Sequence, residues 1–337
     1  MQELMWKHMK NYNIAIVGAT GLVGGKFLEI LDEYNISIGE LKLFATSKSK
    51  GKEIIFRNKQ YKVDVIEKGA FLNIDFALFS AGGNTSLTYA KQAVEEGATV
   101  IDNSSAWRMH KNVPLIVPEV NIEDALNHKL IANPNCSTIQ CVVPLSILDK
   151  QYGVDSIEYN TYQAVSGAGQ MGLADLENNK LDRHYFPYDI KATCIPQIDV
   201  FLDDGYTKEE HKMIDETRKI LHNDNIKISA TCVRVPVRNS HAVSIRVTLK
   251  KDFIIEDIKN LLENEQSIMV LDDPKNSIYP VSTIANDTDK IYIGRLRKDK
   301  INAKALLMYV VSDNIRKGAA SNAIQIMKGI IENGYFS

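Results

Sequence analysis

One cysteine of this sequence lies where its thiol could act as a nucleophile. Cys136 belongs to the polar segment 133–138, which follows the apolar run 130–132 and precedes the helix-like segment 139–150. This order places the thiol where a strand gives way to a helix. The unpaired N–H groups and the dipole of a helix start favour the nucleophilic thiolate. A free cysteine is more often a small buried hydrophobe, but the flanking Asn, Pro, Ser and Thr indicate a tight polar turn.

A histidine and an arginine form a second candidate pair. Arg234 lies in a predicted strand over 227–235, and His241 stands at the start of the next predicted strand, over 242–249. We expect the intervening residues to reverse the chain and bring the two side chains together, although position alone leaves an ordinary packed histidine open. An imidazole can transfer protons, and the fork of a guanidinium can bind both oxygens of a carboxylate.

Other candidates are polar groups at predicted strand and helix ends. Gln163 lies near the end of a predicted strand over 157–165, just before the glycine turn 166–170. Arg108 lies in the polar loop 102–108 after a predicted strand over 99–101, and open α/β sheets bind ligands at such strand ends. Arg108 is therefore a candidate anion ligand, although most loop arginines are merely solvated.

Glu209 and Lys212 are three residues apart in a predicted helix that runs to about Leu221, so they share one face. Thr207 and Glu210 would begin this helix with a capping box. Taken alone, the Glu209–Lys212 pair is most simply an exposed salt bridge.

A glycine-rich turn at the first strand–helix junction predicts a dinucleotide site. The β-branched run 14–17 is followed by Gly18, Gly21 and Gly24 and then by an apolar helix through Tyr34. Glycines let the backbone approach a pyrophosphate, whose charge then lies at the helix N-terminus. Such a motif alone is weak, but its place in an alternating strand–helix pattern strengthens the prediction.

The loop after the second predicted strand, over 41–45, favours NADP. An NAD site usually has an acidic residue there to bind the ribose 2′-hydroxyl. Residues 46–52 offer only hydroxyls and lysines before Glu53, which suits a 2′-phosphate; a solvated charged loop is the alternative. A second small-residue turn, 80–84, follows the apolar run 74–79 and could also lie against a cofactor.

Length, charge and cysteine content limit the classes of protein to which this chain can belong. The 337 residues, 45% of them hydrophobic, suggest two domains, and a net charge of −2 gives no general attraction to nucleic acid or to a membrane surface. The four cysteines have no paired spacing and no zinc-site pattern, which suggests a reducing compartment. No apolar run approaches the roughly 18 residues that a membrane span needs, so we expect a cytoplasmic protein.

The second half of the chain predicts a mixed or antiparallel sheet, because further strands are expected over 290–296 and 304–311 with few helices between them. We also expect a short helix near 173–179. A closing helix over 315–332 would be capped by residues 313–314. Its Gly318-Ala319-Ala320 patch requires a close neighbour, and Pro144 predicts either a kink or an early stop in the helix after Cys136.

With these motifs in place, the chain resembles the aspartate-β-semialdehyde dehydrogenases over nearly its whole length. The resembling stretches are GATGLVG, SKSKGK, DNSSAWR, VPEVN, NPNCSTIQ, YQAVSGAG, EEHKM, RVPVRNSHA and DNIRKGAASNA. NPNCST together with RVPVxxxHA is specific, whereas many dehydrogenases share the glycine loop. Two features depart from the family pattern: about nine extra residues before Lys10, and Pro196-Gln197 where Pro-His is common.

The resemblance implies an α/β fold with a Rossmann-type NADP-binding domain, 10–135, completed by the C-terminal helix 313–337. The second domain, 136–312, would carry the substrate site and a dimer contact. Cys136 would be the acyl-accepting nucleophile, His241 the acid/base and Gln163 the group that orients the reacting atoms. The substrate's α-carboxylate and amine would meet Arg234 and Glu209, and its phosphate would meet Arg108, Asn135 and Lys212.

The cofactor site expected from the glycine loops and the resemblance comprises Gly18, Thr20, Gly21, Leu22, Val23, Gly24, Thr46, Lys48, Ser49, Ser80, Gly82, Ser166, Gly167, Gly169 and Asn314. The nicotinamide would lie between Gly167–Gly169 and Asn314. A thiolate can expel phosphate, hold a thioester and then leave, and N–H groups at the helix start after Cys136 could stabilise the oxyanion.

The expected reaction is the NADPH-dependent reduction of L-4-aspartyl phosphate to L-aspartate 4-semialdehyde with release of phosphate, in lysine, methionine and threonine synthesis. An N-acetyl-γ-glutamyl-phosphate reductase is the nearest alternative, but its substrate has no free amine for Glu209. A catalytically silent dinucleotide-binding relative is a further alternative. We expect a homodimer or a dimer of dimers, with no nucleic-acid or membrane partner and no metal.

Overall fold

The computed structural model describes residues 10–177 and 185–333. The chain divides into two compact units. Unit 1 comprises the chain up to Pro114, Glu123–Asn133 and the chain from Ala323 onward, and unit 2 comprises Leu115–Ile122 and Pro134–Asn322. The nine extra N-terminal residues lie outside the described residues. Within the described ranges, every helix is too short or too polar to cross a bilayer.

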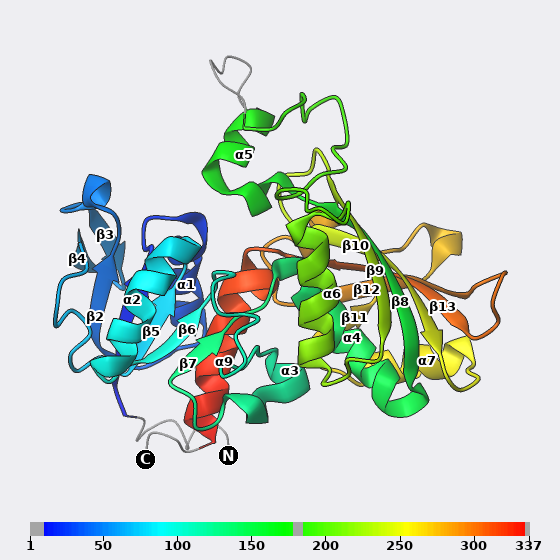
Figure 1. Ribbon diagram of the computed structural model, residues 1–337, viewed down its shortest axis with the longest axis horizontal. Helices are drawn as coiled ribbons and strands as arrows, with labels where there is room; N and C mark the ends of the chain where they lie inside the picture. The colour runs from blue at the N-terminus through cyan, green and yellow to red at the C-terminus, as the bar shows by residue number, and fades with distance from the viewer. Residues whose placement is uncertain (1–9, 178–184, 334–337) are drawn as a thin grey trace. The chain divides into compact units, whose positions relative to one another are not determined.

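Unit 1 is built on a seven-stranded sheet with the strand order β3-β4-β2-β1-β5-β6-β7 (Figure 1). Its strands are β1 (Tyr12–Val17), β2 (Ile38–Phe44), β3 (Glu53–Phe56), β4 (Lys59–Asp64), β5 (Phe76–Phe79), β6 (Thr99–Asp102) and β7 (Leu130–Ala132). The pairs β4–β2–β1–β5–β6–β7 are all parallel, and only the β3–β4 hairpin is antiparallel. The helices of this unit are α1 (Leu22–Glu33), α2 (Gly83–Glu95) and most of α9 (Ser321–Glu332).

The parallel strands of unit 1 are short and apolar because helices cover them. All four residues of β5 are buried, as are five of the six of β1. Such strands lack polar alternation, which is the pattern expected of a parallel sheet covered on both faces. The predicted strand–turn–helix order at β1 and α1 is confirmed.

Unit 2 contains a six-stranded mixed sheet with the order β11-β12-β13-β10-β8-β9. Its strands are β8 (Val154–Gln163), β9 (Lys227–Arg234), β10 (His241–Leu249), β11 (Ile268–Val270), β12 (Ile291–Lys298) and β13 (Ala305–Ser312). The pairs β8–β9 and β11–β12 are parallel, and the other pairs are antiparallel. This confirms the predicted mixed sheet.

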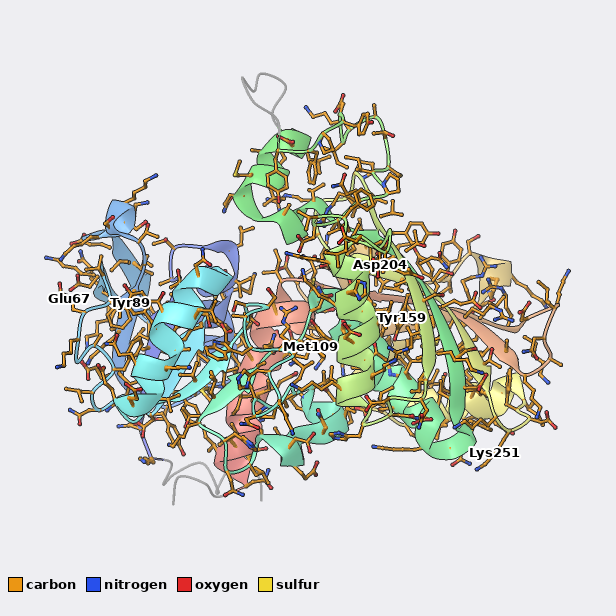
Figure 2. All side chains as sticks on the ribbon, in the orientation of Figure 1. Glu67, Tyr89, Met109, Tyr159, Asp204 and Lys251 are labelled. Carbon is orange, nitrogen blue, oxygen red and sulfur yellow. The ribbon has the colours of Figure 1, made fainter. Side chains whose placement is uncertain are left out.

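One face of this sheet packs against the helices α4 (Cys136–Tyr152), α6 (Lys208–Ile220) and α7 (Ile255–Glu263). β8 shows the resulting alternation: Tyr159, labelled in Figure 2, is buried toward α6, where its hydroxyl lies 3.0 Å from the Thr217 hydroxyl. The neighbouring Glu158, Asn160 and Tyr162 are exposed on the opposite face. The helices therefore cover one face of this sheet, and the opposite face is accessible in part, since Ala285 packs there against Ala242 and Val311.

The remaining elements are short. They are 3₁₀ turns at Ser47–Ser49, Ile122–Ala125, Val165–Ala168 and Pro274–Asn276, the helices α3 (Pro118–Asn121), α5 (Gly169–Glu177) and α8 (Ser282–Ala285), and a π-helical turn at Arg316–Ala320. α5 covers most of the helix expected near 173–179, whose last two residues lie outside the described residues.

The structure decides two points about helix extent. Of the two alternatives predicted at Pro144, an early stop is excluded, because α4 continues through it to Tyr152. The closing helix is not one continuous α-helix over 315–332, since the π turn precedes α9. A π turn inserts extra backbone into a helix and often marks a functional site.

Candidate active site

The start of α4 presents Cys136 as a partly exposed thiol. Asn135 is the N-cap, and its side-chain oxygen accepts hydrogen bonds from the N–H groups of Ser137 (2.9 Å) and Thr138 (3.4 Å). These two N–H groups therefore already have a partner. The prediction that N–H groups following Cys136 stabilise an oxyanion is wrong for Ser137 and Thr138.

Glu209, on α6, joins several of the predicted site residues. One of its oxygens accepts from the side-chain amides of Asn135 (2.8 Å) and Gln163 (3.2 Å), and the other accepts from Lys212 (3.0 Å). Glu209 is buried, so its ion pair with Lys212 is not the exposed helix salt bridge that the spacing alone suggested. The capping box predicted from Thr207 and Glu210 is confirmed.

The charges of this pair are fixed by their surroundings. Burial alone would raise the pKa of the Glu209 carboxyl, but the charge of Lys212 and the hydrogen bonds from Asn135 and Lys212 outweigh it and hold the pKa at about 2. Burial would lower the pKa of Lys212, but Glu209 and Asp199 together raise it above its ordinary value. Both groups are thus ionised at neutral pH.

His241 is fully buried at the start of β10, and its Nδ1 accepts a hydrogen bond from the backbone N–H of Ala164 at 3.0 Å. Burial and the nearby Arg234 charge lower the pKa of the imidazole to about 3, so the ring is neutral. Because Nδ1 is an acceptor, the ring hydrogen lies on Nε2. Nε2 is buried and has no hydrogen-bond partner among the described residues, so it is a donor without an acceptor.

Arg234 lies beside His241. Its Nη1 donates to the carbonyl of Ala164 at 2.7 Å, and its buried Nε has no partner among the described residues. A Cβ placed on Gly167 would lie 2.9 Å from Nη1 of Arg234 and 3.2 Å from Nε2 of His241. The prediction that the chain brings Arg234 and His241 together is therefore confirmed. Burial lowers the pKa of Arg234, and the nearby Glu209 and Cys136 act in the opposite direction and raise it in part.

The close neighbour of the small-residue patch is Cys136 itself. A Cβ on Gly318, in the π turn, would lie 2.9 Å from Cβ and 3.3 Å from Cα of Cys136. Two atoms that are not bonded to each other cannot approach so closely without a shift of the backbone. Gly318 therefore supplies the room in which the cysteine lies.

Asn314 links two loops of unit 2. Its amide oxygen accepts from the N–H of Ser240 (2.9 Å), and its amide nitrogen donates to the hydroxyl of Ser166 (2.9 Å). Ser240 directly precedes His241 and has a left-handed backbone with φ of 70°. A non-glycine residue in that region is strained and is found at functional sites.

Unit 1 contains most of the residues predicted to hold a dinucleotide, whereas Ser166, Gly167, Gly169 and Asn314 belong to unit 2. Gly18 has φ of 88°, and a Cβ there would lie 2.9 Å from the hydroxyl oxygen of Ser80; a Cβ on Gly24 would lie 2.2 Å from the carbonyl oxygen of Gly18. α1 and α2 begin after Gly21 and Gly82, and neither helix start has a side-chain cap. Uncapped helix starts beside a tight glycine turn fit the phosphates of a dinucleotide.

The loop predicted to bind a 2′-phosphate lies against this glycine turn. The Ser49 hydroxyl is 3.4 Å from that of Thr20, and Lys48 is exposed on the 3₁₀ turn between Thr46 and Lys50. Leu22 and Val23 form the first residues of α1. The loop carries no carboxylate of its own.

Arg108 is buried in unit 1. Its Nε donates to the carbonyl of Asn133 (3.0 Å) and its Nη2 to that of Asn103 (2.8 Å). Much of the guanidinium therefore fixes the loop just before the cysteine turn. Asn135 and Lys212, its predicted phosphate-binding partners, belong to unit 2.

Two buried charged residues near the cysteine were not predicted. Lys317, next to Gly318, is fully buried and pairs with Glu119 at 2.6 Å. Glu216 is buried on α6 and accepts from the backbone N–H of Asn135 at 2.6 Å. Glu216 is seven residues after Glu209, and this spacing, which places both on one face of the helix, could have drawn attention to it.

Comparison with known proteins identifies the family of the chain. The family model for the semialdehyde dehydrogenase NAD-binding domain matches residues 13–128, and that for the semialdehyde dehydrogenase dimerisation domain matches 145–317. The aspartate-semialdehyde dehydrogenase of Aquifex aeolicus is 47% identical over 336 residues, covering 96% of this chain and 99% of the relative.

Solved structures agree. Aspartate-semialdehyde dehydrogenase II of Vibrio cholerae, solved in complex with ASA, superposes with a TM-score of 0.92 at 38% identity, covering 97% of this chain and 100% of that one. The enzyme of Candida albicans, solved with NADP, has a TM-score of 0.78 at 26% identity, covering 96% of this chain and 99% of that one. The chain therefore belongs to the aspartate-semialdehyde dehydrogenase family.

Proposed function

We propose that this protein reduces L-4-aspartyl phosphate to L-aspartate 4-semialdehyde, with NADPH as the reductant and phosphate as the second product. The observation that best supports the proposal is the ionised Glu209 carboxylate, which is hydrogen-bonded to the residue before Cys136. Near it lies Arg234, whose buried Nε has no acceptor among the described residues. A carboxylate for an ammonium and a guanidinium for an α-carboxylate together suit a free amino acid.

In the proposed reaction the thiolate of Cys136 attacks the acyl carbon, and the bond from that carbon to the phosphate oxygen breaks. Cys136 then carries a thioester, and NADPH supplies the hydride that reduces it. The oxygen that becomes negative can accept a hydrogen bond from Nε2–H of His241, which has the right tautomer to donate. Removal of one hydrogen-bond donor to such an oxyanion typically costs about 10²- to 10³-fold in rate.

Collapse of the resulting thiohemiacetal releases the aldehyde and returns the thiolate. The oxygen would stay an alkoxide that accepts a hydrogen bond from Nε2–H of His241, and its electron pair would re-form the carbonyl as the carbon–sulfur bond breaks. Gln163, hydrogen-bonded to Glu209, would orient the reacting group. The phosphate of the substrate would meet Lys212 and the second amide hydrogen of Asn135, with Arg108 as the third proposed ligand.

We propose NADP as the cofactor because the side chains of the loop 46–49 suit a 2′-phosphate. Thr46, Lys48 and Ser49 provide hydroxyls and a positive charge beside the glycine turn, and an acidic partner for a ribose 2′-hydroxyl is missing from that loop. The Candida albicans relative solved with NADP supports the same choice. Ser166, Gly167, Gly169 and Asn314 are proposed to lie against the nicotinamide.

We also propose a homodimer formed through the accessible sheet face of unit 2. Tyr162 on β8 is exposed there and stacks at a tilt on Tyr309 of β13, with ring centroids 6.2 Å apart. Tyr309 is half-buried against Ala285 and Val311, which leaves Tyr162 as the exposed ring. An exposed aromatic ring on a sheet suits a protein–protein contact, and the matching family model is that of a dimerisation domain. Light scattering after size exclusion would distinguish a monomer, a dimer and a dimer of dimers.

The reverse reaction gives the simplest test. Phosphate-dependent reduction of NADP should occur with L-aspartate 4-semialdehyde and should be slower by orders of magnitude with N-acetyl-glutamate semialdehyde, which lacks the amine that Glu209 would bind. The opposite preference would favour the reductase of the N-acetylated substrate. A rapid-quench experiment should trap a thioester on Cys136, and an unchanged rate in Cys136→Ala would exclude Cys136 as the nucleophile. Wild-type protein inactive with both semialdehydes would instead indicate a catalytically silent relative.

A further inference from the structure

We propose that Glu216 is a positioning residue that holds the backbone of Asn135 and thereby fixes Cys136 at the start of α4. The inference rests on the proposed function only in taking Cys136 as the nucleophile. Glu216 lies on α6, is 1% exposed, and receives the N–H of Asn135 at 2.6 Å. A hydrogen bond to a carboxylate is stronger than one between neutral groups, so this contact is a firm one.

Two glutamates of α6 accept hydrogen bonds from Asn135. Glu209 receives its side-chain amide at 2.8 Å, while Glu216 receives its backbone amide. The side-chain oxygen of Asn135 in turn caps the helix through Ser137. Hydrogen bonds that involve its backbone N–H, its side-chain nitrogen and its side-chain oxygen therefore define the position of the residue that is covalently joined to Cys136.

The helix start also explains why a buried carboxylate is tolerated beside a nucleophile. α4 is 17 residues long, and its positive end lies at Asn135. A carboxylate placed there is stabilised by the helix dipole.

Cys136 has little freedom to adjust if this support is lost. On its other side lies Gly318, where a Cβ would approach Cβ of Cys136 to 2.9 Å. The cysteine is thus held between the π turn and a backbone that Glu216 fixes. A shift of Asn135 would displace the sulfur from the position that it takes in the proposed reaction, and misplacement by about 1 Å can cost roughly 10²-fold in rate.

The chain offers a matched control in Glu210. It lies on the same helix, is buried, and also accepts from two backbone N–H groups, those of Thr207 (2.6 Å) and Cys232 (3.0 Å). Its loss should destabilise the fold in a similar way but leave Asn135 in place.

The test compares Glu216→Ala, Glu216→Gln and Glu210→Ala in the full chain. Local hydrogen exchange at Asn135 should quicken at least tenfold in Glu216→Ala and stay near the wild-type rate in the other two. kcat for L-aspartate 4-semialdehyde should fall roughly 10- to 100-fold in Glu216→Ala with KM changed less than about threefold. Glu216→Gln keeps an acceptor oxygen and should recover kcat to within about fivefold.

The proposal is overturned if exchange at Asn135 is unchanged in Glu216→Ala, if Glu210→Ala loses as much kcat at the same loss of thermal stability, or if the glutamine fails to restore kcat. Hydrogen exchange needs no substrate. A wild-type protein without semialdehyde activity would therefore refute the proposed function while the Glu216 contact is still tested.

Discussion

The backbone N–H of Ala164 donates to Nδ1 of His241 at 3.0 Å, and this contact sets the form of the imidazole. The accepting nitrogen must be unprotonated, so the neutral ring presents its hydrogen at Nε2. Ala164 directly follows Gln163, and its carbonyl accepts from Arg234. The backbone of one residue directly after β8 therefore orients both the imidazole of His241 and the proposed carboxylate ligand.

This form of His241 predicts acid sensitivity of the fold. Its pKa in the folded protein is about 3, against an ordinary value of 6.5, so between these pH values the unfolded chain binds a proton that the folded chain does not. Stability from this residue is complete above pH 6.5 and is lost as the pH falls toward 3, by about 1.4 kcal/mol per pH unit. Denaturant unfolding from pH 7 to 4 should show this slope, and His241→Gln should lack it.

The same histidine can be observed directly. In protein labelled with ¹⁵N-histidine, the His241 signals at pH 7 should be those of a neutral ring protonated at Nε2, and they should not titrate near pH 6.5. A titration near that value, or a hydrogen on Nδ1, would contradict the assignment and with it the role of Nε2 as a donor.

Local patterns predicted the parts of this fold whose determinants lie close together in the sequence. The β1–Gly18–α1 turn and the Thr207–Glu210 capping box each depend on a few adjacent residues. The β3–β4 hairpin was not predicted, because it turns at Arg57 and Asn58 with φ of 48° and 59° and without a glycine or proline. β3 itself has only four residues.

The features of the site that could not be predicted depend on contacts between residues far apart in the sequence. The π turn has no local sequence signature, and its Gly318 meets Cys136, which lies far from it in the sequence. Glu216 acts on a backbone N–H 81 residues away, and no side-chain type at Asn135 indicates that contact. The Ser137 N–H donates to the side chain of Asn135, the N-cap of α4. This contact depends on the local backbone conformation, which composition alone does not specify.

Gly318→Ala should impair chemistry more than folding. The new methyl group would lie 2.9 Å from Cβ of Cys136, so the cysteine or the π turn must shift. We expect kcat to fall roughly 10²-fold, since small displacements of a reacting atom are costly. Steady-state kinetics with thermal unfolding would measure both effects.

Gly25→Ala is the matched control for that substitution. Gly25 lies inside α1, and a Cβ there meets no atom within 4 Å. It should leave kcat unchanged and stabilise the fold by up to about 1 kcal/mol, because alanine favours helix. Equal activity in Gly318→Ala and Gly25→Ala would mean that the π turn does not confine the cysteine.

Glu209→Gln should weaken binding of the substrate amine. The variant keeps an acceptor oxygen but loses the charge that would attract an ammonium, and it leaves Lys212 with Asp199, 2.9 Å away, as its remaining ion-pair partner. KM for L-aspartate 4-semialdehyde should rise about 10- to 100-fold, which corresponds to about 1.4–2.8 kcal/mol of lost binding. A KM that stays at the wild-type value would remove Glu209 from substrate recognition.

Lys48→Glu tests the choice of cofactor. Lys48 is exposed on the 3₁₀ turn beside Thr20, and a carboxylate there would repel a 2′-phosphate while it could accept from a ribose hydroxyl. KM for NADP should rise at least tenfold with kcat nearly unchanged, and KM for NAD should stay the same or fall. Lys59→Glu, on the exposed β3–β4 hairpin, reverses a charge in the same unit and should alter neither constant. Equal losses with NADP and NAD in Lys48→Glu would show that the loop acts on the shared part of the dinucleotide rather than on its 2′-phosphate.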